Sequence, residues 1–423
     1  MKHTLSRVSR AKFLKQNRKI KPERSVGVAR SWLIGLVGVL MVLVACQPNV
    51  VLVEVTRVVE SAGEETAVSP APSPTPQVIT ITHTVPITTE VIMEVTVTPV
   101  PLGTNGRPVQ LLFPPVANST VISTRSQALV RFLQERTGRQ FEIGILDSEQ
   151  DVIELLCTAP QDTIGFLSAL GYVLAHERCA VQAGLVAAHA DGLTWQAGMI
   201  VTRRDSRITT LADLADKTWA IPDTNSLPNY FYFEALFQAE NIPIGNRLEL
   251  SGDSSAMLAV YNGEADFATG TFVPPIMPNN EPWVFGEDSP EIWRRLGIPP
   301  TRSPIGYVLV LAEPEFGGYR VRDARSGVFD TTPEIFNQTQ ILTLGAQIPN
   351  ETIVLGADFP LGLAREVLDA LPEFVASESC GASLCSADFY GWTAVSPVED
   401  SFYNALRFIL DELDLPAEAT PEE

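Results

Sequence analysis

Short apolar segments alternate with amphipathic segments twice along this chain, and this alternation limits which fold the chain can adopt. In the first set, the segments that we expect to be strands are residues 109–116, 141–146, 163–168, 181–188 and 195–204, and the expected helices are residues 126–137, 147–157 and 171–177. The second set has expected strands at residues 218–223, 247–252 and 265–270. One expected helix begins at Leu227 after the first of these strands, and another ends at Asn262 before the third. Such alternation predicts sheets covered by helices, and 423 residues are enough for two cores. We therefore predict two α/β lobes with a central cleft, the first from residues 108–204 plus 353–413 and the second from residues 205–352.

The start of the chain has the pattern of a secretory signal. The first 30 residues hold ten of the 30 Lys and Arg but one of the 50 Asp and Glu, and residues 31–45 carry no charge. This apolar run is short for a membrane span. It ends in Leu43-Val44-Ala45-Cys46, which resembles the bacterial lipobox, where the cysteine is acylated and the peptide is cut before it. We expect residues 1–45 to be a signal peptide and Cys46 to anchor the protein outside the cell membrane; an uncleaved N-terminal anchor is the alternative.

Residues 46–107 are rich in Val, Thr, Pro and Glu, and this composition predicts an extended tether. The Val/Thr alternation is also compatible with paired strands, although few large side chains are present to build a core. Beyond residue 30 the chain is strongly acidic, which argues against nucleic acid as a partner. Residues 414–423 form an acidic tail.

Four cysteines remain after Cys46, and an even number in an exported chain indicates disulfides. Three pairings are possible, and we favour Cys157–Cys179 with Cys380–Cys385; one bridge with two free thiols is the alternative. Only four His occur, and none lies at ligand spacing from a Cys. We therefore expect neither a metal nor another cofactor.

Four segments resemble a known family when they are taken in order. They are residues 165–172 (GFLSALGY), 210–226 (TLADLADKTWAIPDTNS), 251–266 (SGDSSAMLAVYNGEAD) and 348–354 (IPNETIV). The second is similar to the "L-x-D-L-x-G-K" start of a second lobe, and the third to "S-G-S-H-x-A…A-V-x-x-G-x-x-D" in substrate-binding proteins of phosphate/phosphite/phosphonate-type ABC transporters. In the third segment Ser254 replaces the family's His, with Asp253 beside it. Residues 278–345, including the basic run at Arg320, Arg322 and Arg325, have no clear counterpart, and we expect that run to be solvated or paired with Asp323 and Asp330.

This resemblance implies the type II fold of periplasmic binding proteins. It also implies a monomer that captures a small anionic ligand and delivers it to ABC permease subunits. The first segment implies that Tyr172 reaches the cleft from the first lobe.

Elementary chemistry supports an anion site in the second lobe. The N-terminus of a helix offers unpaired N–H groups and the positive end of the helix dipole. Two hydroxyl-rich turns precede expected helices, and each is also compatible with ordinary capping. Their residues are Thr224, Asn225 and Ser226 in one turn and Ser251, Ser254 and Ser255 in the other. Ser123 and Thr124 are weaker candidates, and Asp266 is expected to accept a hydrogen bond from a protonated or amino-bearing ligand, or else to stabilise a turn.

Two other classes of function compete with solute binding. Gly252-Asp253-Ser254 is superficially like the Gly-Asp-Ser of an esterase, but no His follows His189 to act as a base. A Ser-Lys dyad has only Lys217 available after Lys21. We therefore predict no enzymatic activity. A ligand-binding sensor without a transporter has the same sequence pattern as an importer component.

Overall fold

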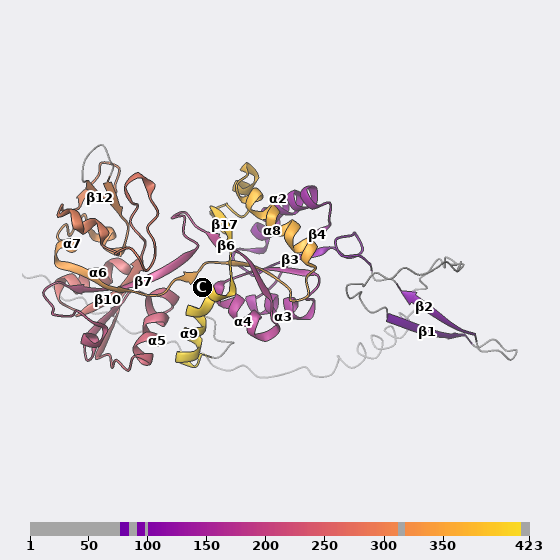
Figure 1. Ribbon diagram of the computed structural model, residues 1–423, viewed down its shortest axis with the longest axis horizontal. Helices are drawn as coiled ribbons and strands as arrows, with labels where there is room; N and C mark the ends of the chain where they lie inside the picture. The colour runs from indigo at the N-terminus through magenta and orange to yellow at the C-terminus, as the bar shows by residue number, and fades with distance from the viewer. Residues whose placement is uncertain (1–76, 84–90, 98–99, 312–317, 416–423) are drawn as a thin grey trace, which may run out of the picture. The chain divides into compact units, whose positions relative to one another are not determined.

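The computed structural model describes residues 77–83, 91–97, 100–311 and 318–415 (Figure 1). The predicted signal peptide, Cys46 and most of the acidic tail lie outside these residues. Part of the predicted tether forms a hairpin, in which β1 (Gln77–His83) pairs antiparallel with β2 (Val91–Val97). These Val/Thr-rich residues therefore form paired strands, which was the alternative to an extended tether.

The first lobe is built on a six-stranded sheet whose inner strands are buried on both faces. Its strands, in spatial order, are β17 (Ala394–Pro397), β6 (Gln182–Ala188), β16 (Thr352–Leu355), β5 (Thr163–Leu167), β3 (Val109–Phe113) and β4 (Phe141–Ile145). One core cluster joins Leu111 and Phe113 to α2 (Ser119–Thr137) and α8 (Leu361–Val375). Leu112, whose side chain points to the other face, packs with α3 (Glu149–Thr158), α4 (Ala169–Cys179) and α9 (Asn404–Leu413). The continuous apolar character of these strands reflects burial on both faces.

Capping residues mark where the helices of the first lobe begin and end. Asn118, Ser148 and Ser168 cap α2, α3 and α4 by accepting a backbone N–H, and Gly138 ends α2 in the left-handed conformation. Because Asn118 is the cap, α2 begins seven residues before the predicted helix. Both predicted disulfides are present, Cys157–Cys179 between α3 and α4 and Cys380–Cys385 after α8.

The second lobe contains another six-stranded sheet. Its strands are β14 (Thr339–Leu344), β7 (Trp195–Arg203), β10 (Phe267–Phe272), β8 (Thr218–Ile221) and β9 (Asn246–Glu249), with β15 (Ile348–Pro349) also paired to β7. The predicted boundary at residue 204 places β7 in the first lobe, but this strand lies in the second sheet, antiparallel to β10 and β14. The chain therefore crosses between lobes before Trp195, and returns between β15 and β16 at residues 350–351. The helices of this lobe are α5 (Tyr232–Ala239), α6 (Asp253–Asn262) and α7 (Ile335–Gln338).

Residues 278–311 and 318–345 belong to the second lobe and contribute side chains to its core. They include a small antiparallel sheet of β11 (Thr301–Arg302), β12 (Val308–Leu311) and β13 (Gly318–Val321). Trp293, Phe329 and Phe336 from this segment are buried in the same cluster as Met257 of α6. The segment without a family counterpart thus covers α6.

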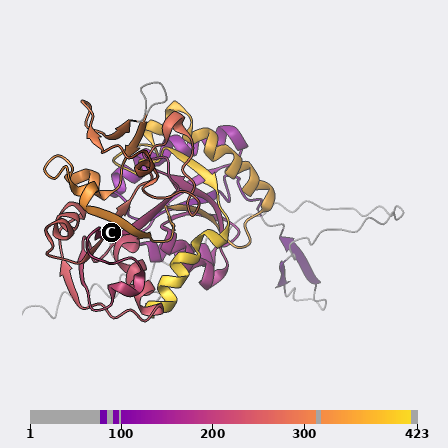
Figure 2. The ribbon, with the colours of Figure 1, turned by 60° about the vertical axis from the view of Figure 1, so that its left-hand side comes forward.

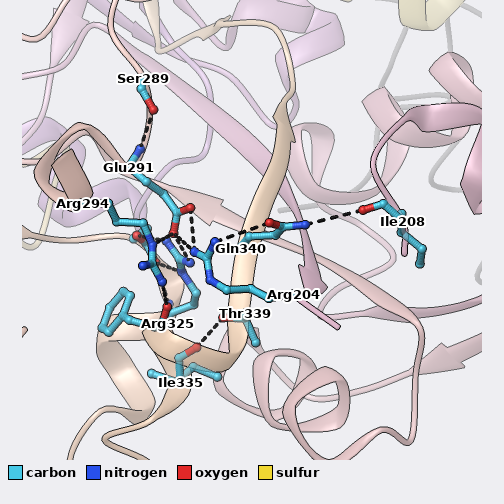
Figure 3. A network of polar contacts seen from close by, with 11 residues as sticks. Arg204, Ile208, Ser289, Glu291, Arg294, Arg325, Ile335, Thr339 and Gln340 are labelled. Atoms are coloured by element: carbon cyan, nitrogen blue, oxygen red, sulfur yellow. Dashed lines mark hydrogen bonds and ion pairs between the residues drawn. The ribbon is translucent and has the colours of Figure 1, made fainter. Parts of the chain in front are cut away.

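A buried ion network fixes this segment (Figure 3). Arg325 is fully buried, with its guanidinium bonded to both oxygens of Asp323 at 2.9 Å and to Glu291 at 2.7 Å. Glu291 also accepts from Arg204 of the β7 end at 3.0 Å. The prediction that Arg325 lies on a solvated face is therefore wrong, whereas its pairing with Asp323 is confirmed; Asp330 pairs with Arg302 instead.

Contacts tie the two lobes together beside the crossing strands. The α9 helix of the first lobe packs on α5 of the second, where the rings of Tyr232 and Phe408 lie 6.0 Å apart (Figure 1; Figure 2). At the crossings themselves, His189 and Glu351 form a 2.8 Å pair. Within the described part of the chain, no helix has both the length and the apolar character that crossing a membrane needs.

Candidate ligand site at the edge of the second lobe

The strand registers determine which sheet edges lie at the crossing. In the first lobe, the carboxyl end of β5 pairs with the start of β16, where the chain has just returned (Leu167 with Thr352). In the second lobe, the carboxyl end of β10 pairs with the start of β7 (Phe272 with Ala197), and β8 runs parallel to β10. The carboxyl ends of the parallel strands therefore lie toward the crossing in both lobes. Ligands of open α/β sheets bind at such carboxyl ends.

The first predicted turn follows β8 at this edge. The Ser226 hydroxyl accepts the N–H of Asn229 at 3.2 Å and so caps the helical turn Leu227–Phe231. The N–H of Asn225 donates to Asp223 at 2.9 Å. In this structure Ser226 therefore acts as a helix cap. Thr224, in the same turn, lines a surface hollow.

The second predicted turn, which follows β9, leaves a helix without a side-chain cap. Gly252 is the N-cap of α6 with φ 82°, a conformation that suits glycine, and it has no side chain with which to cap the helix. Ser255 donates its hydroxyl to the Ser251 carbonyl at 3.1 Å, and Ser254 is exposed. The first-turn N–H groups of α6 thus lack the side-chain acceptor that caps α2, α3 and α4.

The two turns face one hollow. This open depression, of about 470 Å³, is lined by Pro222, Asp223, Thr224, Glu249, Leu250, Ser251 and Gly252. The structure therefore brings the two predicted turns together. The hollow also has two carboxylates among its lining residues, which the sequence analysis did not assign to the site.

Sequence reasoning also missed three residues that meet beside the end of β10. The Asp253 carboxylate accepts the N–H of Thr271 with both oxygens at 3.3 Å, and Asn229 donates its side-chain N–H to the Thr271 hydroxyl at 3.1 Å. Burial raises the pKa of Asp253, the Thr271 bonds oppose this effect, and nearby Asp323 adds to it. The one feature of the sequence that could have identified this group is Asp253, because the family motif has Ser at that position.

The candidates in the first lobe do not line the hollow. Tyr172 is 1 % exposed, its ring packs on Tyr403 with centroids 4.3 Å apart, and its hydroxyl donates to Asp400 at 2.7 Å. Burial and this hydrogen bond raise the pKa of Tyr172. Tyr172 is therefore a core aromatic and does not face a cleft. Ser123 and Thr124 are exposed in the second turn of α2, because that helix begins earlier than expected.

Asp266 lies at the opposite edge of the second sheet. It precedes β10 and accepts the N–H of Thr218, which begins β8, at 2.8 Å. The six residues of β10 separate it from the hollow edge by roughly 20 Å, at about 3.3 Å per residue. The turn-stabilising interpretation of Asp266 is therefore the one that fits, and its assignment to the ligand was wrong.

A carboxylate occupies the N-terminus of α4 at the facing edge of the first lobe. Glu149 accepts the N–H of Ser168 at 2.6 Å and its hydroxyl at 2.9 Å. Gly171 permits this approach, since a Cβ there would lie 2.5 Å from the carboxyl carbon. The oxyanion position at this helix is thus filled by the chain's own side chain. Among the described residues, no cluster of three or more His, Cys, Asp or Glu is arranged to hold a metal ion.

Comparisons with known proteins found solved structures that are similar to the chain. Solved structures similar to the chain include XAC2383 from Xanthomonas citri bound to ATP (13% identity, TM-score 0.41, covering 72% of this chain and 98% of that one). They also include a binding-protein component of an ABC phosphonate transporter from Pseudomonas aeruginosa (15%, 0.35, 72% and 86%). A third is PhnD1 from Prochlorococcus marinus in complex with methylphosphonate (11%, 0.34, 72% and 98%). A search of curated proteins found no match.

The chain also matches a protein family. Residues 111–403 match the family described as "ABC transporter, phosphonate, periplasmic substrate-binding protein". This range contains the second six-stranded sheet with the hollow at its carboxyl edge, and the first sheet apart from Val109 and Gln110. It spans more than half of the chain. The chain therefore belongs to the phosphonate-type family of periplasmic substrate-binding proteins of ABC transporters.

Proposed function

We propose that this protein is a lipid-anchored extracytoplasmic solute-binding protein that captures a small oxyanion, such as a phosphonate, phosphite or phosphate ester, for an ABC importer. The uncapped N-terminus of α6 carries the proposal. Its first-turn N–H groups and the positive end of the helix dipole lie at the carboxyl edge of the sheet, beside the hollow that the two turns line.

Hydroxyl groups next to this helix end would complete the shell around the anion. Ser254 is exposed on the first turn of α6, and Thr224 lies across the hollow. A hydrogen bond to a charged group is worth about 1.5–3 kcal/mol, so one lost donor weakens binding roughly ten- to a hundredfold. In this proposal the first lobe closes over the ligand and contributes no helix N-terminus at Ser168, because Glu149 holds that position.

A ligand panel tests the proposal on the purified protein. Methylphosphonate, phosphite, phosphate and methanesulfonate are added in a thermal-shift assay and the hits are measured by calorimetry. Ligand at a hundred times its dissociation constant stabilises the folded state by about 2.7 kcal/mol, which gives a clear shift. Ser254→Ala should weaken binding by at least tenfold, while Ser123→Ala, which alters an equally exposed serine on α2, should leave it unchanged. Binding of no oxyanion, or equal effects of the two variants, would contradict the site.

A further inference from the structure

Two hydrogen-bond acceptors lie beside the proposed anion site, and their arrangement indicates what the ligand must carry. The first is Asp253, the first residue of α6, whose carboxylate is turned toward the end of β10 and receives the Thr271 N–H. The contacts of this carboxylate are long, at 3.3 Å, and a carboxylate has room for about four donors. Asp253 therefore keeps acceptor capacity at the edge of the sheet.

The second acceptor is a buried amide oxygen. Asn229 is 7 % exposed, and its Nδ2 donates to the hydroxyl of Thr271. Its Oδ1 is buried and has no hydrogen-bond partner among the described residues. A buried acceptor without a donor destabilises the fold, so such an atom is expected to be paired in the working state of the protein.

Thr271 joins the two acceptors into one group. Its N–H is bonded to Asp253 and its hydroxyl to Asn229, so both acceptors lie around the same residue at the carboxyl end of β10. Other negative groups are close by: Asp223 and Glu249 line the hollow, and Asp323 lies near Asp253 but is paired with Arg325. These groups repel any anion, and only an anion with a hydrogen to donate would gain a bond to Asp253 or Asn229 that offsets the repulsion.

We propose that Asp253 and Asn229 form an acceptor subsite next to the α6 N-terminus, which requires the ligand to present a hydrogen-bond donor, such as an acidic P–OH, beside its oxyanion. This inference rests on the proposed function and names the residues that set its specificity. A sulfonate has the same tetrahedral shape as a phosphonate but no such hydrogen, and it would leave both acceptors unpaired. Sites built to bond a donor reject analogues that lack it, because their polar groups then stay unsatisfied.

Methylphosphonate and methanesulfonate provide the test, because they differ in that one hydrogen. Calorimetry at mildly acidic pH, where methylphosphonate is a monoanion, should give wild-type protein at least a tenfold preference for methylphosphonate. Asp253→Asn adds a side-chain donor and should reduce that preference by about tenfold through tighter binding of methanesulfonate. Asp253→Ser, which installs the residue of the family motif, should act in the same direction. Glu249→Gln is the charge-matched comparison, since it removes one charge from the hollow without touching Thr271. It should strengthen the binding of both monoanions alike, so its preference for methylphosphonate should stay within about twofold of wild type.

The possible outcomes separate the inference from the function on which it rests. Binding of both anions with equal affinity to wild-type protein would overturn the inference and leave the proposed function intact, whether or not the variants fold. Equal gains in methanesulfonate affinity for the Asp253 variants and Glu249→Gln would also overturn it, because general repulsion would then explain the selectivity. Binding of neither anion would overturn the inference, and the proposed function falls with it if phosphite and phosphate also fail to bind.

Discussion

Replacing Glu291 by Gln tests whether the buried network holds residues 278–345 in the second lobe. Glu291 has a side chain that is 12% exposed, and its carboxylate contacts three guanidinium groups. The nearest belongs to Arg325, which is fully buried, and the others to Arg204 and Arg294 (Figure 3). Glu291→Gln keeps the shape of the side chain and removes its charge. Asp323 then remains as the sole carboxylate bonded to Arg325.

The structure indicates the size of the effect. Removing one partner of a buried ion pair destabilises a protein by about 3–5 kcal/mol, because the remaining charge stays buried without compensation. Asp330, which pairs with Arg302 at 2.6 Å, provides the contrast: its side chain is 71% exposed, and a surface pair contributes about 0–1 kcal/mol. We therefore expect Glu291→Gln to lower the free energy of unfolding by about 3 kcal/mol and Asp330→Asn by less than about 1 kcal/mol.

Urea unfolding followed by tryptophan fluorescence measures both variants, since Trp293 is buried beside the network. Equal costs for Glu291→Gln and Asp330→Asn would refute the reasoning. A pH series provides a second check. Burial opposes ionisation of Glu291, but Arg325 and Arg204 outweigh it and lower its pKa. A lowered pKa means that this stabilisation is present above the unfolded pKa and is lost as the pH falls through the folded pKa, so the wild-type advantage over Glu291→Gln should shrink in acid.

Three further predictions concern the crossing strands, a disulfide and the chain start. The hydrogen bond that the His189 ring donates to Glu351 raises the pKa of His189. Their pair should therefore stabilise the fold below about pH 6.5 and lose this effect as the pH rises through the raised pKa; His189→Gln should flatten that part of the urea-midpoint profile against pH. Serine at both Cys157 and Cys179 should cost roughly 3 kcal/mol in urea unfolding, because that bridge closes a 22-residue separation. Mass spectrometry of membrane-extracted protein should find an acylated Cys46 as the first residue, and a chain that retains residues 1–45 would refute this.

Much of the fold was predictable because it depends on local patterns. The apolar strands at residues 109–113 and 163–167 follow from periodicity, which neighbouring residues largely determine. The lobe to which β7 belongs is a matter of long-range pairing. Its partners are β10 and β14, which begin 64 or more residues beyond its end, and nothing within Trp195–Arg203 specifies them. For the same reason the burial of Arg325 could not be read from a run of alternating charges.

The candidate site was predictable only where the residues of a turn themselves indicate the start of a helix. Ser226 and Gly252 lie next to the helices that they begin, so their turns could be identified from the sequence. Tyr172 and Asp266 were assigned by their place in a motif, and the fold directs one into the core and the other to the far edge. Asp253 shows why the ligand depends on more than the family. A carboxylate at the first position of a helix offsets part of the positive dipole charge there, which amounts to about half an elementary charge. We therefore expect a bare dianion to bind this helix end less well than a ligand that brings its own hydrogen, and residue 253 to decide between them.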